Sequence, residues 1–346
     1  MGAYKPPLEG RHPERNLLLD FNERTLPVAE CVQKALIDYI AKGLIQMYPS
    51  YGDTVEKIGA YCSVPSDQIM LTNGSDQGID LIFRAACREG DEAIIPGPGF
   101  AMYNQCAGIE NLNIISPQYR RETGFPTEGV LDALSPKTKI ICIANPNNPC
   151  GTVISREDIV QILKAAPEAA VLVDECYFEY AGETVADLVD IYPNLLITRT
   201  FSKTWGMPSL RLGYVISSAE NIRALLNVRG PYDVNQLAIV AVRAALLVPE
   251  QTLDYVNEVM QQSKPFFEGF LLKEGIEFWP SGANFIWVFV DNPNAIQQYL
   301  QSHQILVRPK QDADGRTGLR ITLGTLEQTQ HLVDVLTRAL GLSEVE

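Results

Sequence analysis

Lys203 stands in a segment where a hydroxyl side chain lies on either side of it and two arginines are within reach. The segment, from Arg199 to Tyr214, reads RTFSKTWGMPSLRLGY. An isolated lysine is most often a solvated surface group. The three histidines of the chain lie outside every motif described below, so a mechanism centred on histidine is disfavoured. If the chain is an enzyme, its base must be a different side chain, and Lys203 is a candidate.

Other polar side chains follow apolar, strand-like runs. Ligands bind beyond the carboxyl ends of parallel strands, so residues at those ends are candidates for one site. The candidates are Gly74, Ser75, Asp76, Phe100, Asn148, Asp174, Tyr177, Thr200, Ser202, Lys203 and Arg211. Together they supply an amine, an aromatic ring, a carboxylate, a phenol, hydroxyl and backbone donors and an arginine. They contain neither a metal-ligand set nor a Ser/His/Asp set.

Each of these segments also has a purely structural interpretation. The run NGSDQG before a predicted helix can be a tight turn with Ser75 as its cap, and Asp174 and Glu175 can be ordinary helix caps. The run NPNNPCG can be a proline-rich loop. A functional interpretation is favoured because the segments occur together, each at the end of a predicted strand.

The order of the predicted elements indicates an α/β fold. Between about residues 50 and 220, apolar strand-like runs alternate with helical periodicity, the pattern of a parallel sheet covered by helices. These strands are too continuously apolar for a half-exposed sheet, so we expect them to be buried. In SREDIVQIL, Ser155 and Asp158 form the capping-box pattern that starts a helix.

Changes in sequence pattern along the chain predict three parts. Residues 1–28 form a proline-rich arm, residues 29–232 a large domain and residues 233–346 a smaller α+β domain. In the last part, the segments NFIWVFV and LRITLG each show the residue alternation expected of strands in a half-exposed sheet. Pro265 is expected to kink or break one of the long helices there.

Composition restricts the class of protein. The chain has 346 residues, of which 46% are hydrophobic and 20% charged, as in ordinary globular proteins. A net charge of −14 without clusters of Lys and Arg argues against a nucleic-acid partner. No uncharged apolar stretch is long enough to cross a membrane and no signal region is recognised, so we expect a cytoplasmic protein. Seven cysteines without C-x-x-C spacing predict reduced thiols rather than disulfides or a zinc site.

Taken together, the segments resemble the fold-type I pyridoxal phosphate (PLP) aminotransferases, and within them the histidinol-phosphate aminotransferases. The resemblance covers nearly the whole chain and is carried by LDFNE, MYPSYGD, TNGSDQGIDLIFRA, PGFAMY, NPNNPCG, VDECYFEY, RTFSKTWGMPSLRLGY, PYDVNQ and LRITLG. It implies a large domain with a mostly parallel seven-stranded sheet between helices, and a smaller α+β domain. It also implies a homodimer in which each active site draws on both chains.

The resemblance assigns a role to each matching residue around the cofactor ring. Lys203 is expected to hold PLP as a Schiff base and to move a proton between the substrate α-carbon and the cofactor C4′. Asp174 is expected to pair with the pyridine nitrogen, where a carboxylate at about 4 Å contributes about 4 kcal/mol at an effective dielectric of about 20. That energy raises the pKa of the ring nitrogen by about three units, so the ring stays protonated. Tyr177 and Asn148 would hydrogen-bond the ring O3′, and Phe100 would stack on the ring.

The cofactor phosphate is assigned to the start of the helix after Gly74, where backbone N–H groups and the helix dipole favour an anion. The residues expected to complete this cradle are Ser75, Asp76, Thr200, Ser202 and Arg211. In this family the residue at Tyr48 reaches the phosphate held by the neighbouring subunit. No metal is expected at the site.

Substrate contacts also follow from the resemblance. Arg320 in LRITLG is expected to clamp the substrate carboxylate or an equivalent group through its planar fork. Arg308 and Tyr4 are expected to hold the phosphate of histidinol phosphate, and Asn22 is a further expected contact. A simpler interpretation of Arg308 is an exposed arginine at the end of a strand.

Three segments depart from the family pattern. Cys150 replaces the usual threonine, and Thr204 and Trp205 are bulkier than the common residues. The run NERTLP lacks the proline-aromatic-glycine sequence often found there. Trp205 and Thr25 are therefore expected to lie near the substrate and to affect which side chain it carries.

The leading hypothesis is transamination of L-histidinol phosphate with 2-oxoglutarate, a step of histidine biosynthesis that gives imidazole acetol phosphate and glutamate. One alternative is an aromatic amino acid aminotransferase acting on phenylalanine or tyrosine. Another is a PLP-dependent decarboxylase or lyase. A PLP-binding regulator without turnover is disfavoured because the set of expected catalytic residues is intact. A dinucleotide oxidoreductase is excluded because no G-x-G-x-x-G follows any strand.

Overall fold

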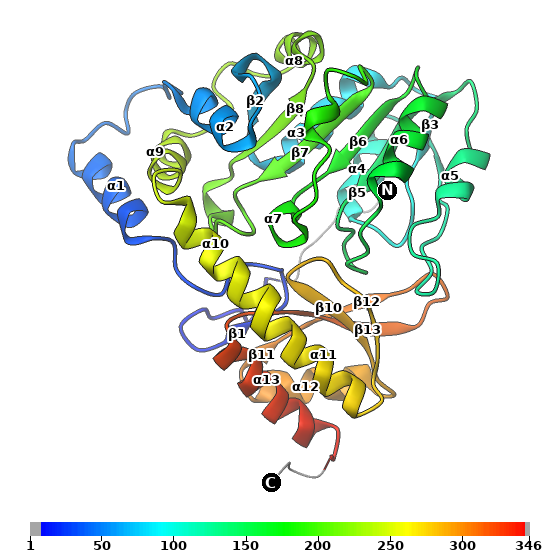
Figure 1. Cartoon of the computed structure of the whole chain (residues 1–346). Helices are drawn as coiled ribbons and strands as arrows, with labels where there is room; N and C mark the ends of the chain where they lie inside the picture. Colours follow the sequence, from blue (N-terminus) through cyan, green and yellow to red (C-terminus); the bar gives the residue numbers. More distant parts are fainter. Residues whose placement is uncertain (1–7, 343–346) are drawn as a thin grey trace.

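The computed structural model describes residues 8–342, and a seven-stranded sheet organises the larger part of them (Figure 1). In spatial order its strands are β2 (Ile69–Thr72), β8 (Gly213–Ser217), β7 (Leu195–Thr200), β6 (Ala170–Asp174), β5 (Thr138–Ala144), β3 (Glu92–Ile94) and β4 (Asn113–Ile115). β8 runs antiparallel to both of its neighbours, and the other neighbouring pairs are parallel. The predicted fold class, with a mostly parallel seven-stranded sheet, is confirmed.

The central strands are apolar along their whole length because each face of the sheet packs against helices. On β6, Val171 and Val173 belong to one core and Leu172, between them, belongs to the other. The helices that supply buried residues to the first core include α1 (Glu30–Ala41), α2 (Thr54–Cys62), α6 (Arg156–Ala165) and α9 (Gln236–Ala245). Those of the second core include α3 (Gly74–Ala86), α4 (Ala101–Ile109) and α8 (Ala219–Leu226). Alternation along each strand therefore fills two apolar layers, as expected for a buried parallel sheet.

The cap predicted for α6 is present. The Ser155 side chain accepts a hydrogen bond of 3.1 Å from the backbone N–H of Asp158. This bond satisfies one of the donors that the first turn of a helix leaves open.

A second, antiparallel sheet lies below the first in Figure 1 and has the spatial order β12 (Arg308–Gln311), β13 (Thr317–Thr322), β10 (Phe285–Phe289) and β9 (Glu277–Trp279). The prediction that this sheet is half exposed is wrong, because all five residues of β10 are buried. Helices α11 (Lys264–Lys273), α12 (Pro293–Ser302) and α13 (Leu326–Ala339) contribute to the core with Ile286, which lies on the other face of β10 from Trp287. Trp287 packs instead with Tyr119 and Cys150 of the larger part.

The amino-terminal arm runs along the smaller sheet. Strand β1 (Leu17–Leu18) pairs in parallel with β11 (Ile305–Leu306), and the backbone of Leu19 bonds to Leu306 and Thr322. This pairing brings residues 20–23 to the edge of the pocket described below. Tyr4 lies outside the described residues.

The packing of α9 bears on the boundary between the two domains. The buried residues Ala238, Ile239 and Val242 of α9 belong to the core under the large sheet, beside α1. We therefore propose that the large domain ends in the turn after Ala245, rather than at residue 232. The chain then crosses to the smaller sheet as one long helix, seen in yellow in Figure 1.

Pro265 does not break this long helix. Helix α10 (Pro249–Glu258) continues through a π-helical turn, Val259–Ser263, directly into α11. A π-helical turn widens the helix, so the missing N–H of a proline and the bulk of its ring are tolerated there. Among the described residues, no single helix combines the length and the apolar character needed to span a membrane. Only α9 taken with residues 249–273 does so, as a pair bent by 76°.

Candidate active site

A pocket lies at the carboxyl ends of the parallel strands. It is lined by Ser75, Asp76, Phe100, Tyr103, Ala144, Pro146, Asn148, Asp174, Cys176, Tyr177, Thr200, Ser202, Lys203 and Arg211. The strand-end residues singled out in the sequence thus share one site, except that Gly74 lies directly beside it. Parallel strands that end at the same edge of a sheet bring together residues that are far apart in the chain.

One wall of the pocket is the start of α3. Gly74 has a φ of +74°, and a Cβ there would lie 2.3 Å from Nη2 of Arg211. The same Nη2 donates a hydrogen bond of 2.9 Å to Asp76. The first N–H groups of α3, an arginine and the hydroxyls of Thr200 and Ser202 thus surround one end of the pocket. This donor set fits a phosphate group, because backbone N–H groups and the helix dipole both favour an anion.

Asp174 lies at the floor of the pocket and is buried. Its carboxylate accepts hydrogen bonds from the Tyr103 hydroxyl (2.6 Å) and from the backbone N–H of Cys176 (3.3 Å). Burial raises the pKa of Asp174, and the bonds from Cys176 and Tyr103 oppose that rise. Within residues 8–342, no Lys, Arg or His forms an ion pair with it. A buried carboxylate in this state fits a ligand that brings its own positive charge, such as a protonated ring nitrogen.

The amine of Lys203 lies opposite the arm. Its Nζ donates a 2.9 Å hydrogen bond to the carbonyl oxygen of Phe21 and lies 6.0 Å from the centre of the Tyr177 ring. The Tyr177 hydroxyl accepts a hydrogen bond of 3.0 Å from the side-chain amide of Asn22, which has a φ of 56°. The arm therefore closes the site through Phe21 and Asn22.

Two predicted substrate residues lie on the smaller sheet. Arg320 of β13 donates hydrogen bonds of 2.5 Å to the side-chain oxygen of Asn148 and to the carbonyl oxygen of Asp20. Arg308 of β12 is directly opposite Arg320 in the antiparallel register, and its guanidinium lies 5.3 Å from the centre of the Phe21 ring. The small sheet thus presents cations beside the pocket.

Tyr48, expected at the partner subunit's cofactor, and Thr25 do not line the pocket of their own chain. Tyr48 is 78% exposed and stacks on Tyr232, with their ring centres 4.4 Å apart. Thr25 hydrogen-bonds to Gln328 and Tyr255 rather than lining the site.

Trp205 does not line the pocket, in contrast to the expectation that it lies near the substrate. Its indole N–H donates a 3.0 Å hydrogen bond to Glu179, and its ring packs against Tyr61 and Phe201 in the core of the large domain. A large apolar ring with one polar atom is stable in a core when that atom finds a partner. Glu179 supplies this partner.

Comparison with known proteins identifies the family. The family model for aminotransferase class I and II matches residues 15–336, almost the whole of the described chain. The chain belongs to the class I and II aminotransferases. It is 34% identical over 331 residues, covering 93% of each chain, to a histidinol-phosphate aminotransferase from Caldanaerobacter subterraneus subsp. tengcongensis.

Solved structures show the same fold for this aminotransferase. A histidinol-phosphate aminotransferase from Sinorhizobium meliloti, solved in complex with pyridoxal 5′-phosphate, has a TM-score of 0.86 at 21% identity, with 97% of this chain and 96% of that chain covered. An L-threonine-O-3-phosphate decarboxylase from Porphyromonas gingivalis has a TM-score of 0.79 at 22% identity, with 94% and 99% covered. At these identities the structures establish the architecture, and the donor set of the pocket must carry the chemistry.

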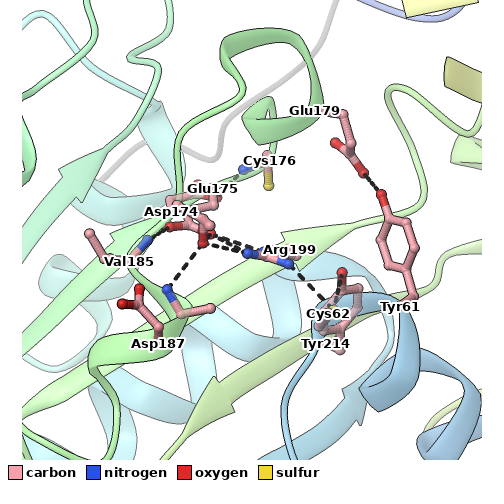
Figure 2. Close-up of polar contacts among 12 residues, drawn as sticks. Tyr61, Cys62, Asp174, Glu175, Cys176, Glu179, Val185, Asp187, Arg199 and Tyr214 are labelled. Carbon is pink, nitrogen blue, oxygen red and sulfur yellow. Dashed lines mark hydrogen bonds and ion pairs between the residues drawn. The ribbon is translucent and has the colours of Figure 1, made fainter.

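A buried ion pair supports the strand ends that carry the aminotransferase site (Figure 2). Arg199 donates hydrogen bonds of 2.9 and 2.8 Å to Glu175 from Nε and Nη2, and Nη1 donates one of 3.3 Å to Cys62. Both side chains of the ion pair are almost fully buried. Because successive residues of a strand point to opposite faces, this ion pair lies behind Asp174 and Thr200. It joins β6 to β7 just where they reach the pocket.

Several residues of the site carried too little local signal to be singled out in the sequence. Tyr103 lies three residues after Phe100 in PGFAMY, one helical turn away, and this spacing is its only signal. Phe21 acts through its carbonyl oxygen, which every residue has. Among the described residues, no group of three or more His, Cys, Asp or Glu side chains could hold a metal ion.

Glu179 should make the stability of this aminotransferase depend on pH. Burial is the largest cause that raises the pKa of Glu179 from 4.5 to about 7, against hydrogen bonds from Thr204 and Trp205. The folded state therefore binds this proton more tightly than the unfolded state, and its stability falls as pH rises from about 4.5 to about 7. Glu179→Gln should remove this loss, which is at most about 3 kcal/mol.

Thermal unfolding of wild-type protein and Glu179→Gln, measured between about pH 5 and about pH 8, tests this prediction. The glutamine keeps an oxygen for the Tyr61 hydroxyl and the Trp205 N–H, so the network should survive. The unfolding temperature of the wild type should fall relative to the variant as pH rises. Parallel curves for the two proteins would show that Glu179 keeps an ordinary pKa.

Proposed function

We propose that this aminotransferase uses PLP to transfer the amino group of L-histidinol phosphate to 2-oxoglutarate, a step of histidine biosynthesis. The products are imidazole acetol phosphate and glutamate. The observation that carries the proposal is that Lys203 and the buried Asp174 line one pocket, while Arg320 bonds to Asn148 at its edge with Arg308 directly opposite in the sheet. The histidinol-phosphate aminotransferase that is 34% identical over 93% of the chain supports the choice of substrate.

The residues of the pocket fit PLP at both of its ends. Asp174 would hold the pyridine nitrogen, Tyr177 and Asn148 the ring hydroxyl, and Phe100 one face of the ring. The phosphate would be held by the cradle of Ser75, Asp76, Thr200, Ser202 and Arg211. When bound, PLP supplies the electron sink that makes the α-carbon of an amino compound acidic. Asp174 strengthens that sink by keeping a positive charge on the ring.

The protein's own part in the reaction is proton movement and positioning. Lys203 is the base that takes the proton from the α-carbon of the amino donor with its Nζ, and the acid that returns it. The hydrogen bond of Nζ to the Phe21 carbonyl orients the amine toward the pocket. Arg308 and Arg320 hold the phosphate of the donor, its one anionic group, which places the α-carbon near the lysine.

The proposal includes a homodimer in which the partner subunit's Tyr48 reaches the cofactor phosphate. Its support is the surface around α1, where Ile37, Ile40, Ile45 and Met47 are 65%, 50%, 61% and 54% exposed and adjoin Tyr48. Exposed apolar patches of this kind mark interaction surfaces. Sedimentation equilibrium tests the dimer, and a species of 38.3 kDa alone would exclude it.

The donor is tested by mixing the PLP-loaded protein, without any keto acid, with histidinol phosphate or with phenylalanine. Conversion of the cofactor is followed by absorbance, and the product is analysed. Much faster conversion by histidinol phosphate, with a keto product, supports the proposal. Equal or faster conversion by phenylalanine indicates an aromatic amino acid aminotransferase, and release of carbon dioxide indicates a decarboxylase. Adding 2-oxoglutarate to the converted protein then tests the amino acceptor.

Arg308→Ala should discriminate between donors. The variant should raise KM for histidinol phosphate by about tenfold to a hundredfold, because a guanidinium bound to a phosphate forms a charge-assisted pair. KM for phenylalanine should change by less than about twofold, because phenylalanine carries no phosphate for Arg308 to bind. Arg316→Ala is the matched control, since Arg316 lies in the same sheet region and pairs with Glu277 at the surface. Equal losses for both donors in Arg308→Ala would show that Arg308 does not hold the phosphate.

A further inference from the structure

The turn that carries Lys203 is tied to the large domain by a single carboxylate. The two residues that follow Lys203 both donate a side-chain hydrogen bond to Glu179. The Thr204 hydroxyl bonds to Oε2 and the Trp205 indole N–H to Oε1, each at 3.0 Å. Thr204 and Trp205 are buried. A buried indole N–H without a partner is costly, so loss of the carboxylate would force this turn to rearrange.

Glu179 lies on the same short helix that presents Tyr177 to the pocket. Helix α7 (Phe178–Ala181) begins directly after Tyr177, which lines the pocket and is the residue proposed for the ring hydroxyl. The hydrogen bonds of Glu179 therefore connect the phenol side of the pocket with the turn that carries the amine. The placement of Lys203 relative to Tyr177 depends on this connection.

Helix α7 is a firm support for the turn. The Arg199 guanidinium lies 3.7 Å from the centre of the Phe178 ring, and Arg199 is itself fixed by its buried ion pair with Glu175. Figure 2 shows the Tyr61 hydroxyl directed at the Glu179 carboxylate, to which it donates a hydrogen bond of 3.3 Å. The carboxylate is thus held in place by its neighbours and can act as a fixed point.

Few backbone bonds fix the turn itself. Residues 201–207 form neither helix nor strand. The backbone N–H of Gly206 bonds to the carbonyl oxygen of Lys203 at 3.0 Å, and Arg24 of the arm donates a bond of 3.3 Å to the carbonyl oxygen of Thr204. Segments with few backbone bonds open locally at low cost in free energy. The two side-chain bonds to Glu179 therefore carry much of the order of this turn.

We propose that Glu179 is a positioning residue that holds the turn of Lys203 and so places its amine for attachment of the cofactor and for proton transfer. Glu179 is not among the residues that line the pocket, so it acts through Thr204 and Trp205. A misplacement of about 1 Å caused by a distant substitution can lower a rate about a hundredfold. The inference rests on the role proposed for Lys203 and does not depend on which amino donor is used.

Glu179→Leu removes both acceptor oxygens and should lower kcat with histidinol phosphate by about tenfold to a hundredfold. KM should stay within about twofold, because no residue proposed to hold the donor is changed. Glu179→Gln should recover most of the rate, since it keeps an oxygen for Trp205 and offers an amide to the Thr204 hydroxyl. Glu258→Leu is the matched control: Glu258 is also partly buried, and it accepts a hydrogen bond from the N–H of Leu326, away from the pocket.

A double-mutant cycle distinguishes positioning through Trp205 from a general loss of stability. Trp205→Phe removes the indole donor and should lower kcat in the wild-type background. In the Glu179→Leu background it should lower kcat no further, because both changes break the same hydrogen bond. Independent losses that multiply would show that Glu179 does not act through Trp205.

Two further measurements need no amino donor. Hydrogen exchange of the PLP-loaded protein should show the amide of Gly206 exchanging about tenfold faster in Glu179→Leu than in the wild type. The fraction of bound PLP that borohydride links to Lys203 should fall in Glu179→Leu and stay near the wild-type value in Glu179→Gln and Glu258→Leu. The phosphate cradle at the start of α3 is unchanged, so equilibrium dialysis should still detect bound PLP.

The outcomes separate failure of this inference from failure of the proposed function. If Glu179→Leu keeps the exchange of Gly206, the link to Lys203 and the wild-type kcat, Glu179 is not a positioning residue. An equal loss of kcat in Glu258→Leu would also overturn the inference. If histidinol phosphate is not a donor, the two measurements without a donor still decide the role of Glu179. If Glu179→Leu does not fold, Thr204→Val combined with Trp205→Phe removes both donors and should give the same loss.

Discussion

Replacing Lys203 with alanine should lower the rate of amino transfer by at least about ten-thousand-fold. A positioned acid–base group contributes about a hundredfold to ten-thousand-fold, and the loss of a nucleophilic amine adds to this. Lys203 is the amine that lines the pocket between Asp174 and the arm, and its Nζ is held by a single hydrogen bond to Phe21. No other lysine among the residues that line this pocket could take over its role.

Lys203→Arg distinguishes the effect of the positive charge from the effect of an amine that can act as base and nucleophile. The arginine keeps the positive charge but does not act as a base, because its pKa stays above about 12. Both variants should lose covalently attached PLP, detected by borohydride reduction followed by peptide mass analysis, whereas Lys57→Ala at the surface should keep it. If either Lys203 variant kept a reducible link to PLP, the attachment site would be a different residue.

Replacing Asp174 with asparagine should lower the rate about a thousandfold while PLP still binds. Two unit charges about 4 Å apart attract by about 4 kcal/mol at an effective dielectric of about 20, which corresponds to about three powers of ten in rate. Asparagine preserves the size of the side chain and an oxygen that accepts from Tyr103, so the change removes mainly the charge. The phosphate cradle at the start of α3 does not involve this side chain and should still hold the cofactor.

Asp80→Asn is the matched control for this substitution, because Asp80 forms a partly exposed pair with Arg84 on α3, away from the lining of the pocket. Single-turnover absorbance with the amino donor measures the rate, and equilibrium dialysis measures PLP binding. Near-normal turnover in Asp174→Asn would mean that a different group stabilises the ring. If PLP binding were weakened but the rate at saturating PLP were normal, Asp174 would contribute only to the affinity for the cofactor.

The fold class and most of the residues that meet at the pocket could be predicted from the sequence. Continuous apolar strands such as AVLV in β6 can be stable only with helices on both faces, which specifies a buried, mostly parallel sheet. In such a sheet the strand ends converge at one edge, so the residues that follow Thr72, Ala144 and Thr200 must come together. These inferences follow from local patterns and from geometry that every parallel sheet shares.

The directions of side chains in turns and at domain contacts depend on tertiary contacts and could not be predicted. Trp205 follows Lys203 by two residues, yet its direction is set by Glu179 and Tyr61, which come from two other helices. The smaller sheet is buried on both faces because its outer side meets the larger domain at Tyr119. Contacts between segments that are distant in the chain produce no periodic pattern in the sequence of either segment.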